Sequence, residues 1–367
     1  MGRFSFVVVV LGLAGCGRLG FGESGPADPN AELGANIVGG VVDASARSPA
    51  VCESLPNLAT SSCPDVDLSL ATTPTGIAVV WVPVAGGDLT GIALQANRAI
   101  GNLTTIKTGV FTASSAAYLD GQLIAGGISS SRAIVHTVVQ PMGAGTEIGN
   151  FDGEFVGKTT LTHSNGDRVA ATSCSSGLTM NAFDNAWNGQ AGTFSVTTNQ
   201  TMNIDATPID TQSFAVWSTS TSCNYETITS KTTGTTRATN SKACLDARLT
   251  SNNTEVGMVF DGGGKVGLVV DDASTLSVLA SITINGARSP RVLWDGSRYW
   301  VSYFDTGTSK VVIGYIDEYG MLLTSQLQLD ASADKAYELG MFDGQPWLFA
   351  VGADMKLSAN RMCVPAY

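Results

Sequence analysis

A short turn sequence recurs at nearly constant spacing through most of the chain. It consists of seven residue pairs, each between two β-prone runs: Thr75-Gly76, Asp120-Gly121, Asn165-Gly166, Asp210-Thr211, Asn252-Asn253, Asp295-Gly296 and Asp343-Gly344. Counted on the second residue of each pair, the steps are 45, 45, 45, 42, 43 and 48 residues. Asp-Gly and Asn-Gly favour tight hairpins because glycine accepts the positive φ that such turns require. Spacing this regular indicates one repeated unit rather than unrelated domains.

The stretch from Gly286 to Leu329 shows what one unit contains. It is predicted to form four short strands, which are Ser289–Trp294, Arg298–Phe304, Lys310–Asp317 and Met321–Leu329. Three turns separate these strands, so the unit is an antiparallel meander. A meander of this length and strand number is typical of one blade of a β-propeller.

The run that follows each turn is apolar and often aromatic. Trp81, Trp217, Trp300 and Trp347 all fall in such runs. Near-continuous apolar runs predict inner strands that are covered on both faces, as when sheets stack face to face. With 42 glycines and only 14% charged residues in 367, the composition also favours many short strands and tight turns over long helices.

The predicted fold is therefore all-β, a seven-bladed β-propeller over residues 50–367, with a six-bladed ring and an irregular module as the alternative. The seventh repeat is one strand short before the chain stops at Tyr367. We expect Ala50–Ala59 to supply the missing strand and so to cover an exposed edge. Cys52 would then lie near Cys363, although a local Cys52–Cys63 loop is an alternative.

The N-terminus carries the most specific motif of the chain. Met1-Gly2-Arg3 is a short cationic start, and Phe4–Leu13 is an apolar run too short to span a bilayer. The sequence Leu13-Ala14-Gly15-Cys16 that follows resembles the lipobox of bacterial lipoproteins. That resemblance implies a signal peptide over residues 1–15, removed before Cys16, and an acylated Cys16 that anchors the chain in membrane lipid. Since Gly17 rather than Asp follows the cysteine, it also implies the outer membrane.

Residues 16–49 are rich in Gly, Ala, Pro, Asn and Ser, and they predict a flexible tether between the lipid and the folded body. Within the body, the sequence Ser289-Pro290-Arg291-Val292-Leu293-Trp294-Asp295-Gly296-Ser297-Arg298-Tyr299-Trp300-Val301 resembles the repeats of bacterial cell-surface lipoproteins with propeller domains. The other six repeats match only in turn and strand pattern. This resemblance implies architecture and location rather than an activity.

Six cysteines remain once Cys16 is assigned to the lipid. An even number in an exported protein predicts up to three disulfides. In the frame of the repeats, Cys223 and Cys244 fall at the same end of neighbouring units and are the predicted pair, with Cys174 as the competing partner.

Candidate reactive groups are few, and each has a simpler structural interpretation. His136 and His163 stand in no motif with a nucleophile or carboxylate. The segment Asp261–Lys265 lacks the spacing of a phosphate-binding loop, so a hairpin turn is expected. Asp271-Asp272 and the pair Asp330 and Asp334 lack the spacing of a calcium loop. Trp187 is predicted in a loop, where it either stacks on a sugar or covers a neighbouring unit.

The function that these features favour is non-enzymatic. A net charge of -11 and a pI near 4.6 disfavour nucleic acid as a partner. We expect a surface protein that binds a protein, a glycan or an envelope component through one propeller face, with no cofactor, no metal and no catalytic residues. The alternative is an envelope hydrolase or lyase with a carboxylate or metal site in the central channel.

Overall fold

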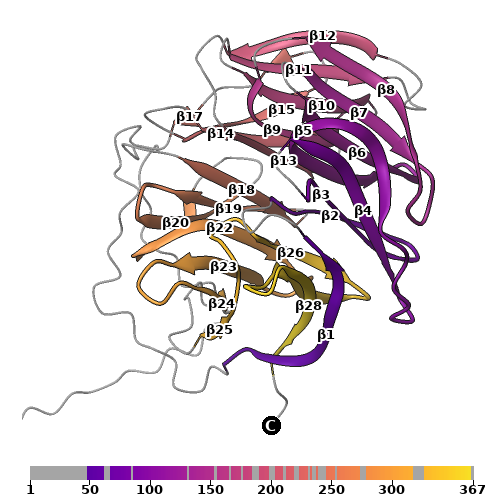
Figure 1. Cartoon of the computed structure of the whole chain (residues 1–367). Coiled ribbons are helices and arrows are strands. Elements are labelled where there is room, and N and C mark those ends of the chain that lie inside the picture. The colour runs from indigo at the N-terminus through magenta and orange to yellow at the C-terminus, as the bar shows by residue number, and fades with distance from the viewer. Residues whose placement is uncertain are drawn as a thin grey trace, which may run out of the picture.

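The computed structural model describes residues 48–61, 67–83, 86–129, 132–152, 155–164, 167–174, 177–183, 190–197, 203–209, 212–218, 223–229, 232–233, 237–238, 245–252, 254–272, 278–316 and 326–364. Every regular element within these ranges is a β-strand, which confirms the predicted all-β class (Figure 1). No helix that could cross a membrane occurs in this part of the chain.

The strands form six sheets in which all neighbours are antiparallel. The largest sheet contains β2 (Ser69–Thr73), β3 (Gly76–Trp81), β4 (Gly87–Gln95), β5 (Thr104–Leu119), β6 (Gln122–Ser129), β7 (Arg132–Val138) and β8 (Gly145–Asp152). The next two sheets contain β9 (Phe155–Ser164), β10 (Asp167–Cys174), β11 (Gly177–Phe183) and β12 (Gln190–Thr197), and then β13 (Asn203–Ile209), β14 (Gln212–Ser218), β15 (Cys223–Thr229), β16 (Thr232–Thr233) and β17 (Arg237–Ala238).

Two further sheets follow the chain in the same way. They contain β18 (Asp246–Ser251), β19 (Glu255–Asp261), β20 (Lys265–Asp272) and β21 (Val278–Asn285), and then β22 (Ala287–Trp294), β23 (Tyr299–Asp305), β24 (Lys310–Ile316) and β25 (Leu327–Leu329). The last sheet joins both ends of the described chain, with β26 (Tyr337–Phe342), β27 (Gln345–Val351), β28 (Lys356–Cys363) and β1 (Ala50–Thr60). The unit predicted over Gly286–Leu329 is thus the four-stranded sheet β22–β25.

Each of the seven predicted turn pairs stands in the sequence where one strand ends and its antiparallel neighbour begins, with Gly76 already the first residue of β3. The strands on either side of each pair are antiparallel neighbours, namely β2–β3, β5–β6, β9–β10, β13–β14, β18–β19, β22–β23 and β26–β27. At Asp120-Gly121 and Asp343-Gly344 both residues have positive φ, with 51° and 82° at the first turn and 53° and 66° at the second. Two successive positive φ angles define the hairpin turn that Asp-Gly favours, which explains why the positions of these turns could be predicted locally.

One strand departs from the simple repeat. The first part of β5 pairs with β4, from Gly87↔Phe111 to Gly91↔Thr104, and its second part pairs with β6, from Phe111↔Ser129 to Leu119↔Gln122. It is therefore both the fourth strand of one group and the first strand of the next. Register shifts near Phe111 let the strand change partners without a turn, which the turn-based prediction did not anticipate.

We call the strand that opens each group a first strand: β2, β5, β9, β13, β18, β22 and β26. Each first strand contacts the next, and β26 contacts β2, so the contacts return to their start. Their hydrogen bonds join residues one repeat apart, as in Ser69 Oγ to the Ser114 carbonyl at 2.9 Å and the Trp294 N–H to Thr250 Oγ1 at 3.1 Å. Equivalent positions meet, so the first strands run side by side in one direction.

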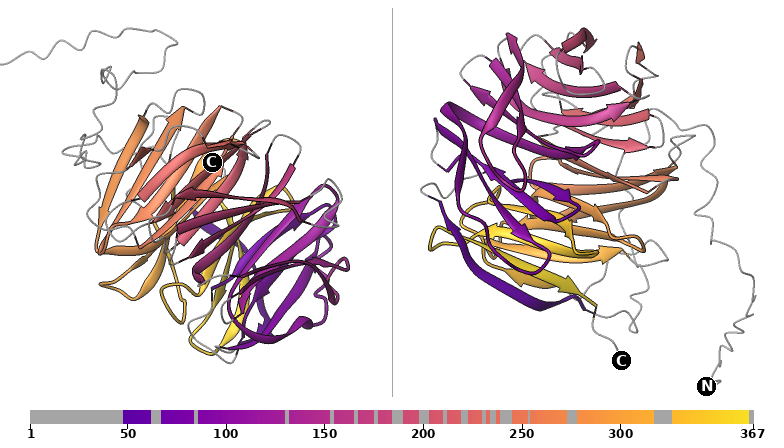
Figure 2. Two further views of the ribbon diagram at one scale, coloured as in Figure 1. Left: turned by 90° about the horizontal axis from the view of Figure 1, so that it is seen from above. Right: turned by 90° about the vertical axis from the view of Figure 1, so that its right-hand side faces the viewer.

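The apolar core lies between the faces of successive sheets, which Figure 2 shows stacked. One cluster joins Trp347 and Phe349 of β27 to Ile77 and Val79 of β3, and another joins Trp300 of β23 to the last sheet. The four tryptophans of the predicted apolar runs are all buried, at 2% exposure or less. The expectation that these runs are covered on both faces is confirmed for the runs whose side chains the structure describes. They are the second strands of their groups, one position outside the first strands.

The predicted pairing of the N-terminal segment with the last strand is present. Strand β1 lies antiparallel to β28 from Ala50↔Cys363 to Thr60↔Lys356, with two register shifts. Cys52 and Cys363 form a disulfide across this pair. Figure 1 shows the indigo β1 beside the yellow β28. Only Leu58 of this strand is fully buried, so backbone pairing and the disulfide hold it more than its side chains do.

Arg98, which follows β4 in the first sheet, stabilises the contact between β1 and the last sheet. Its Nε donates to Glu53 of β1 at 2.7 Å, and its Nη1 donates to Asp343 at 3.2 Å. The guanidinium also lies over the ring of Trp347, with its carbon 5.1 Å from the ring centroid. The hydrogen bond from Arg98 lowers the pKa of Glu53 below its ordinary value. Three parts of the chain that are far apart in sequence are thus held by one side chain.

Candidate functional site

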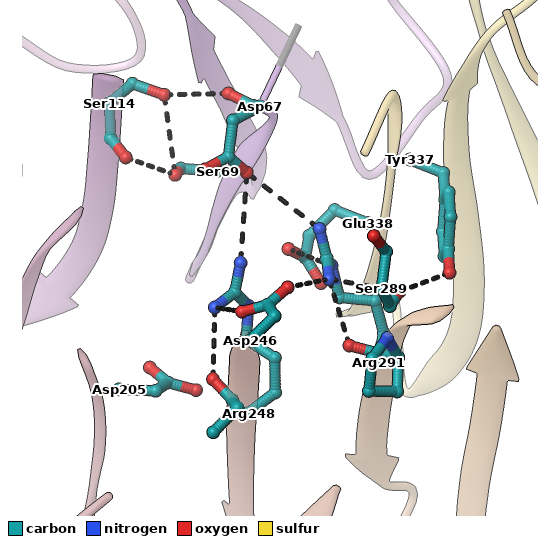
Figure 3. A network of polar contacts seen from close by, with 12 residues as sticks. Asp67, Ser69, Ser114, Asp205, Asp246, Arg248, Ser289, Arg291, Tyr337 and Glu338 are labelled. Atoms are coloured by element: carbon teal, nitrogen blue, oxygen red, sulfur yellow. Dashed lines mark hydrogen bonds and ion pairs between the residues drawn. The ribbon is translucent and has the colours of Figure 1, made fainter. Parts of the chain in front are cut away.

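The first strands bring a group of charged and polar side chains together in the interior (Figure 3). We call this group the central cluster, and its members are Asp67, Asp205, Asp246, Arg248, Ser289, Arg291, Tyr337 and Glu338. Asp67 lies two residues before β2, and the others lie on β13, β18, β22 and β26. Five of the seven groups therefore contribute to one site.

Arg291 is the most buried member, with 1% of its side chain exposed. Its Nη1 donates to Asp246 Oδ2 at 3.0 Å and to the Pro290 carbonyl at 2.9 Å, and its Nε lies 2.9 Å from Glu338 Oε2. Burial by itself lowers the pKa of Arg291, but the carboxylates of Glu338 and Asp246 outweigh burial and raise the pKa above its ordinary value. The guanidinium is therefore charged, as a buried cation surrounded by acids should be.

Asp246 holds two guanidinium groups at once. Its Oδ1 accepts from Arg248 Nη1 at 2.5 Å, while its Oδ2 accepts from Arg291 Nη1 at 3.0 Å. Arg248 and Asp246 are two residues apart on β18, so they point to the same side of the strand. One carboxylate thus orients two arginines from neighbouring sheets.

Asp67 reaches the same two arginines from the first sheet. Its Oδ1 lies 3.9 Å from Nη2 of Arg248 and 3.9 Å from Nη2 of Arg291. Its backbone carbonyl accepts from Ser114 Oγ at 3.0 Å, which fixes the main chain there. The side chain of Asp67 is 26% exposed, more than those of its two arginine neighbours and of Asp246 and Glu338.

Ser289 extends the network through its peptide groups. Its N–H donates to Asp261 Oδ2 at 3.0 Å, and its carbonyl accepts from the hydroxyl of the buried Tyr337. Ser289 has φ of 50°, an unusual angle for a residue with a side chain, and these bonds hold it there. Burial raises the pKa of Asp261 above its ordinary value, although the N–H groups of Ser289 and Gly263 oppose the shift.

Sequence reasoning missed the central cluster. The only signal in the sequence is the position of its members in the repeat. Asp246 and Arg291 are 45 residues apart, and each of the two arginines stands five residues before the second residue of the turn pair that follows it. A charged residue at that place in a first strand points inward instead of to solvent. Alignment of the repeats on their turns would have placed these side chains together.

His136 is buried on β7 and does not belong to the central cluster. Neither ring nitrogen makes a hydrogen bond of good geometry, and the one weak contact is with the Ala125 backbone. Burial, with a smaller contribution from Lys107, lowers its pKa to about 4, while Glu147 and the Ala125 backbone oppose the shift. His136 is therefore a neutral core residue at physiological pH, as its structural interpretation predicted.

Other predicted positions have plain roles or lie outside the described side chains. Asp261–Lys265 is the hairpin turn between β19 and β20, as expected. Asp330 pairs with Lys310 at 3.2 Å and Asp334 with Arg288 at 3.1 Å. Within the described ranges, no three His, Cys, Asp or Glu side chains gather as they would around a metal ion. Cys16, Trp187 and Cys244, and the side chains of His163, Cys174, Asp271 and Asp272, lie outside what the structure describes.

The cysteines agree with part of the predicted scheme. Cys52 pairs with Cys363, so the local Cys52–Cys63 loop does not form. Cys223 is also disulfide-bonded, and its partner is not among the cysteines whose side chains the structure describes. The Cys223–Cys244 pairing therefore stays a prediction that peptide mapping without reduction would test, and a Cys174–Cys223 peptide would contradict it.

Comparisons with known proteins add a likeness of fold. No protein-family model matches the sequence, and no curated protein matches it. Among solved structures, a chain of Kuenenia stuttgartiensis hydrazine synthase is similar, with a TM-score of 0.57 and 11% sequence identity. The match covers 84% of this chain and 98% of that chain. At such low identity the similarity concerns the β-sheet architecture alone.

Proposed function

We propose that this chain is a lipid-anchored protein of the cell envelope whose folded part, a seven-bladed β-propeller, binds another molecule through one face. Seven groups of antiparallel strands support the propeller, because their first strands contact one another in a series that returns to its start. The pairing of β1 with β28 supplies the last group with its fourth strand. A six-bladed ring accounts for these contacts less well, since all seven first strands take part.

The anchor is supported by the sequence alone. The run Leu13-Ala14-Gly15-Cys16 after a short apolar segment favours acylation of Cys16 and placement at the outer membrane. A tether over residues 16–49 would then join the lipid to Ala50, where β1 begins. The body would hang from the outer edge of its last sheet.

One observation favours binding over catalysis: the carboxylates of the central cluster already have hydrogen-bond or ion-pair partners. Asp246 accepts from two arginines, Glu338 lies against Arg291, and Asp205 Oδ2 accepts the Leu249 N–H at 2.9 Å. Catalytic acids and bases need a proton that can be exchanged near working pH. Carboxylates that are paired with arginines hold neighbouring strands together instead. A partner would then bind at one of the two ends of the ring.

The end at which the first strands begin is the better candidate for the binding face. The exposed side of the central cluster opens there through Asp67. Leu245, which directly precedes Asp246, is 51% exposed on that end, an unusual position for a large apolar side chain next to a charged cluster. The Asp120-Gly121 turn lies at the opposite end.

Crosslinking on intact cells tests the proposal. A photo-crosslinking amino acid at Leu245 should give one defined adduct, which excess purified protein should suppress by competition. The same label at Asp120 serves as the matched control on the other end and should give none. Adducts of equal yield at both positions would contradict a dedicated face. No adduct at either position, together with stoichiometric calcium or zinc in the purified protein, would favour an envelope enzyme instead.

A further inference from the structure

We propose that Arg248 and Arg291 form a carboxylate-binding site and that Asp67 fills this site from within the same chain. The site does not depend on the envelope role proposed above. Its ligand class is a small monocarboxylate or the side chain of an acidic residue. Figure 3 shows the two guanidinium groups turned toward Asp67 from one side, with Asp246 between them.

The two arginines are oriented before any ligand is bound. Asp246 accepts from Nη1 of both, at 2.5 Å and 3.0 Å, which leaves Nη2 of each directed toward Asp67. Pre-oriented donors do not lose side-chain freedom when a ligand binds, which favours affinity. The planar fork of N–H donors on each guanidinium group also suits the two oxygens of a carboxylate.

The donors are not saturated by Asp67. Its Oδ1 is 3.9 Å from each Nη2, beyond hydrogen-bond distance, and Nη2 of Arg291 is buried without a hydrogen-bond partner. Nε of Arg248 is buried and unpartnered as well. A buried charged donor without a partner carries a desolvation penalty. A carboxylate that is free of the chain could approach both arginines to the shorter distances typical of charge-assisted hydrogen bonds.

The site can be emptied without moving the backbone. The Asp67 carbonyl is held by Ser114 Oγ at 3.0 Å, so truncation of the side chain should leave a space the size of the lost atoms. That space faces solvent, because the Asp67 side chain is 26% exposed while Arg291 is 1% exposed. Asp67→Ala removes one carboxylate group, which formate replaces. Asp67→Gly removes one carbon more, which acetate replaces.

The test measures the Tm of the full-length chain in detergent, with and without these anions. Asp67→Ala should lower Tm by about 2–6 °C, because two arginines lose a facing charge. Formate should restore most of the loss in Asp67→Ala, and acetate should do so in Asp67→Gly. Chloride at equal concentration should not. Wild-type protein and Asp67→Ala/Arg248→Met should not respond to formate.

Each result decides the proposal. Equal responses of wild type and Asp67→Ala to formate would overturn it, because a general salt effect would explain both. An unchanged Tm in Asp67→Ala would overturn it as well. If Asp67→Ala does not fold during expression, the yield on refolding from urea replaces Tm, and it should recover with formate but not with chloride. Equal yields in the two salts would contradict the site.

Discussion

Acidification should destabilise this protein through His136, and the size of the effect follows from its burial. The folded pKa is about 4, against an ordinary value of 6.5. The unfolded chain therefore binds the proton more tightly than the folded chain does. The stability that His136 contributes is fully present above pH 6.5 and is lost as the pH falls toward 4. Linkage gives a loss of about 2 kcal/mol at pH 5 and about 3 kcal/mol at pH 4.

The assay is urea unfolding followed by tryptophan fluorescence, from pH 7 to pH 4, on wild type and His136→Leu. Leucine has a similar volume and no proton to bind, and the ring nitrogens that it replaces make no hydrogen bond of good geometry. The variant should equal or exceed wild type at pH 7, and its advantage should grow by about 3 kcal/mol by pH 4. Val138→Leu, a buried change on the same strand, should follow the wild-type pH dependence. Parallel curves for wild type and His136→Leu would refute the reasoning.

Four further expectations concern the chain ends and one buried acid. Deleting residues up to Ser48 should barely change Tm, whereas deleting through Thr60 removes β1 and should lower Tm strongly or prevent folding; equal Tm values would show that β1 does not close the last sheet. Cys52→Ser should cost up to roughly 6 kcal/mol in the chain-entropy model, read as a lower urea midpoint, and Cys363→Ser should show the same loss. Cys16→Ser should abolish labelling by a fatty-acid probe and block maturation, and a labelled, mature variant would exclude the lipid anchor there. Burial raises the pKa of Asp261, so the stability that this group contributes increases as the pH falls through its folded pKa. The free energy of unfolding of wild type should therefore rise relative to that of Asp261→Asn between pH 7 and pH 4 in the same assay. A constant difference between the two proteins would argue against the shift.

The parts of the fold that could be predicted are those set by local chemistry. The Asp120-Gly121 and Asp343-Gly344 turns need positive φ, and few other residue pairs supply it, so the positions of these turns could be predicted. The tryptophans indicated the buried second strands, because large apolar side chains at these positions are expected to be covered. Strand β1 followed from counting, because the last repeat lacked one strand.

The central cluster could not be predicted in the same way. Arg291 stands in the best-matching repeat, yet a single arginine in a strand looks the same whether it meets solvent or a buried carboxylate. Its partners come from β18, β26 and the segment before β2, and only the contacts between first strands bring these together. The continuity of β5 was missed because no turn residue marks the point where one group ends.

The Cys52–Cys363 bond makes the described body almost a covalent circle, since it spans 311 residues of sequence. A force applied between the N-terminal segment and the C-terminus would be transmitted through the disulfide bond. The sheets between Cys52 and Cys363 would therefore not bear it. A protease that cuts one loop would open the circle but release no fragment. A molecule held at a cell surface by its N-terminal end would keep its shape under tension and its parts after a single cut.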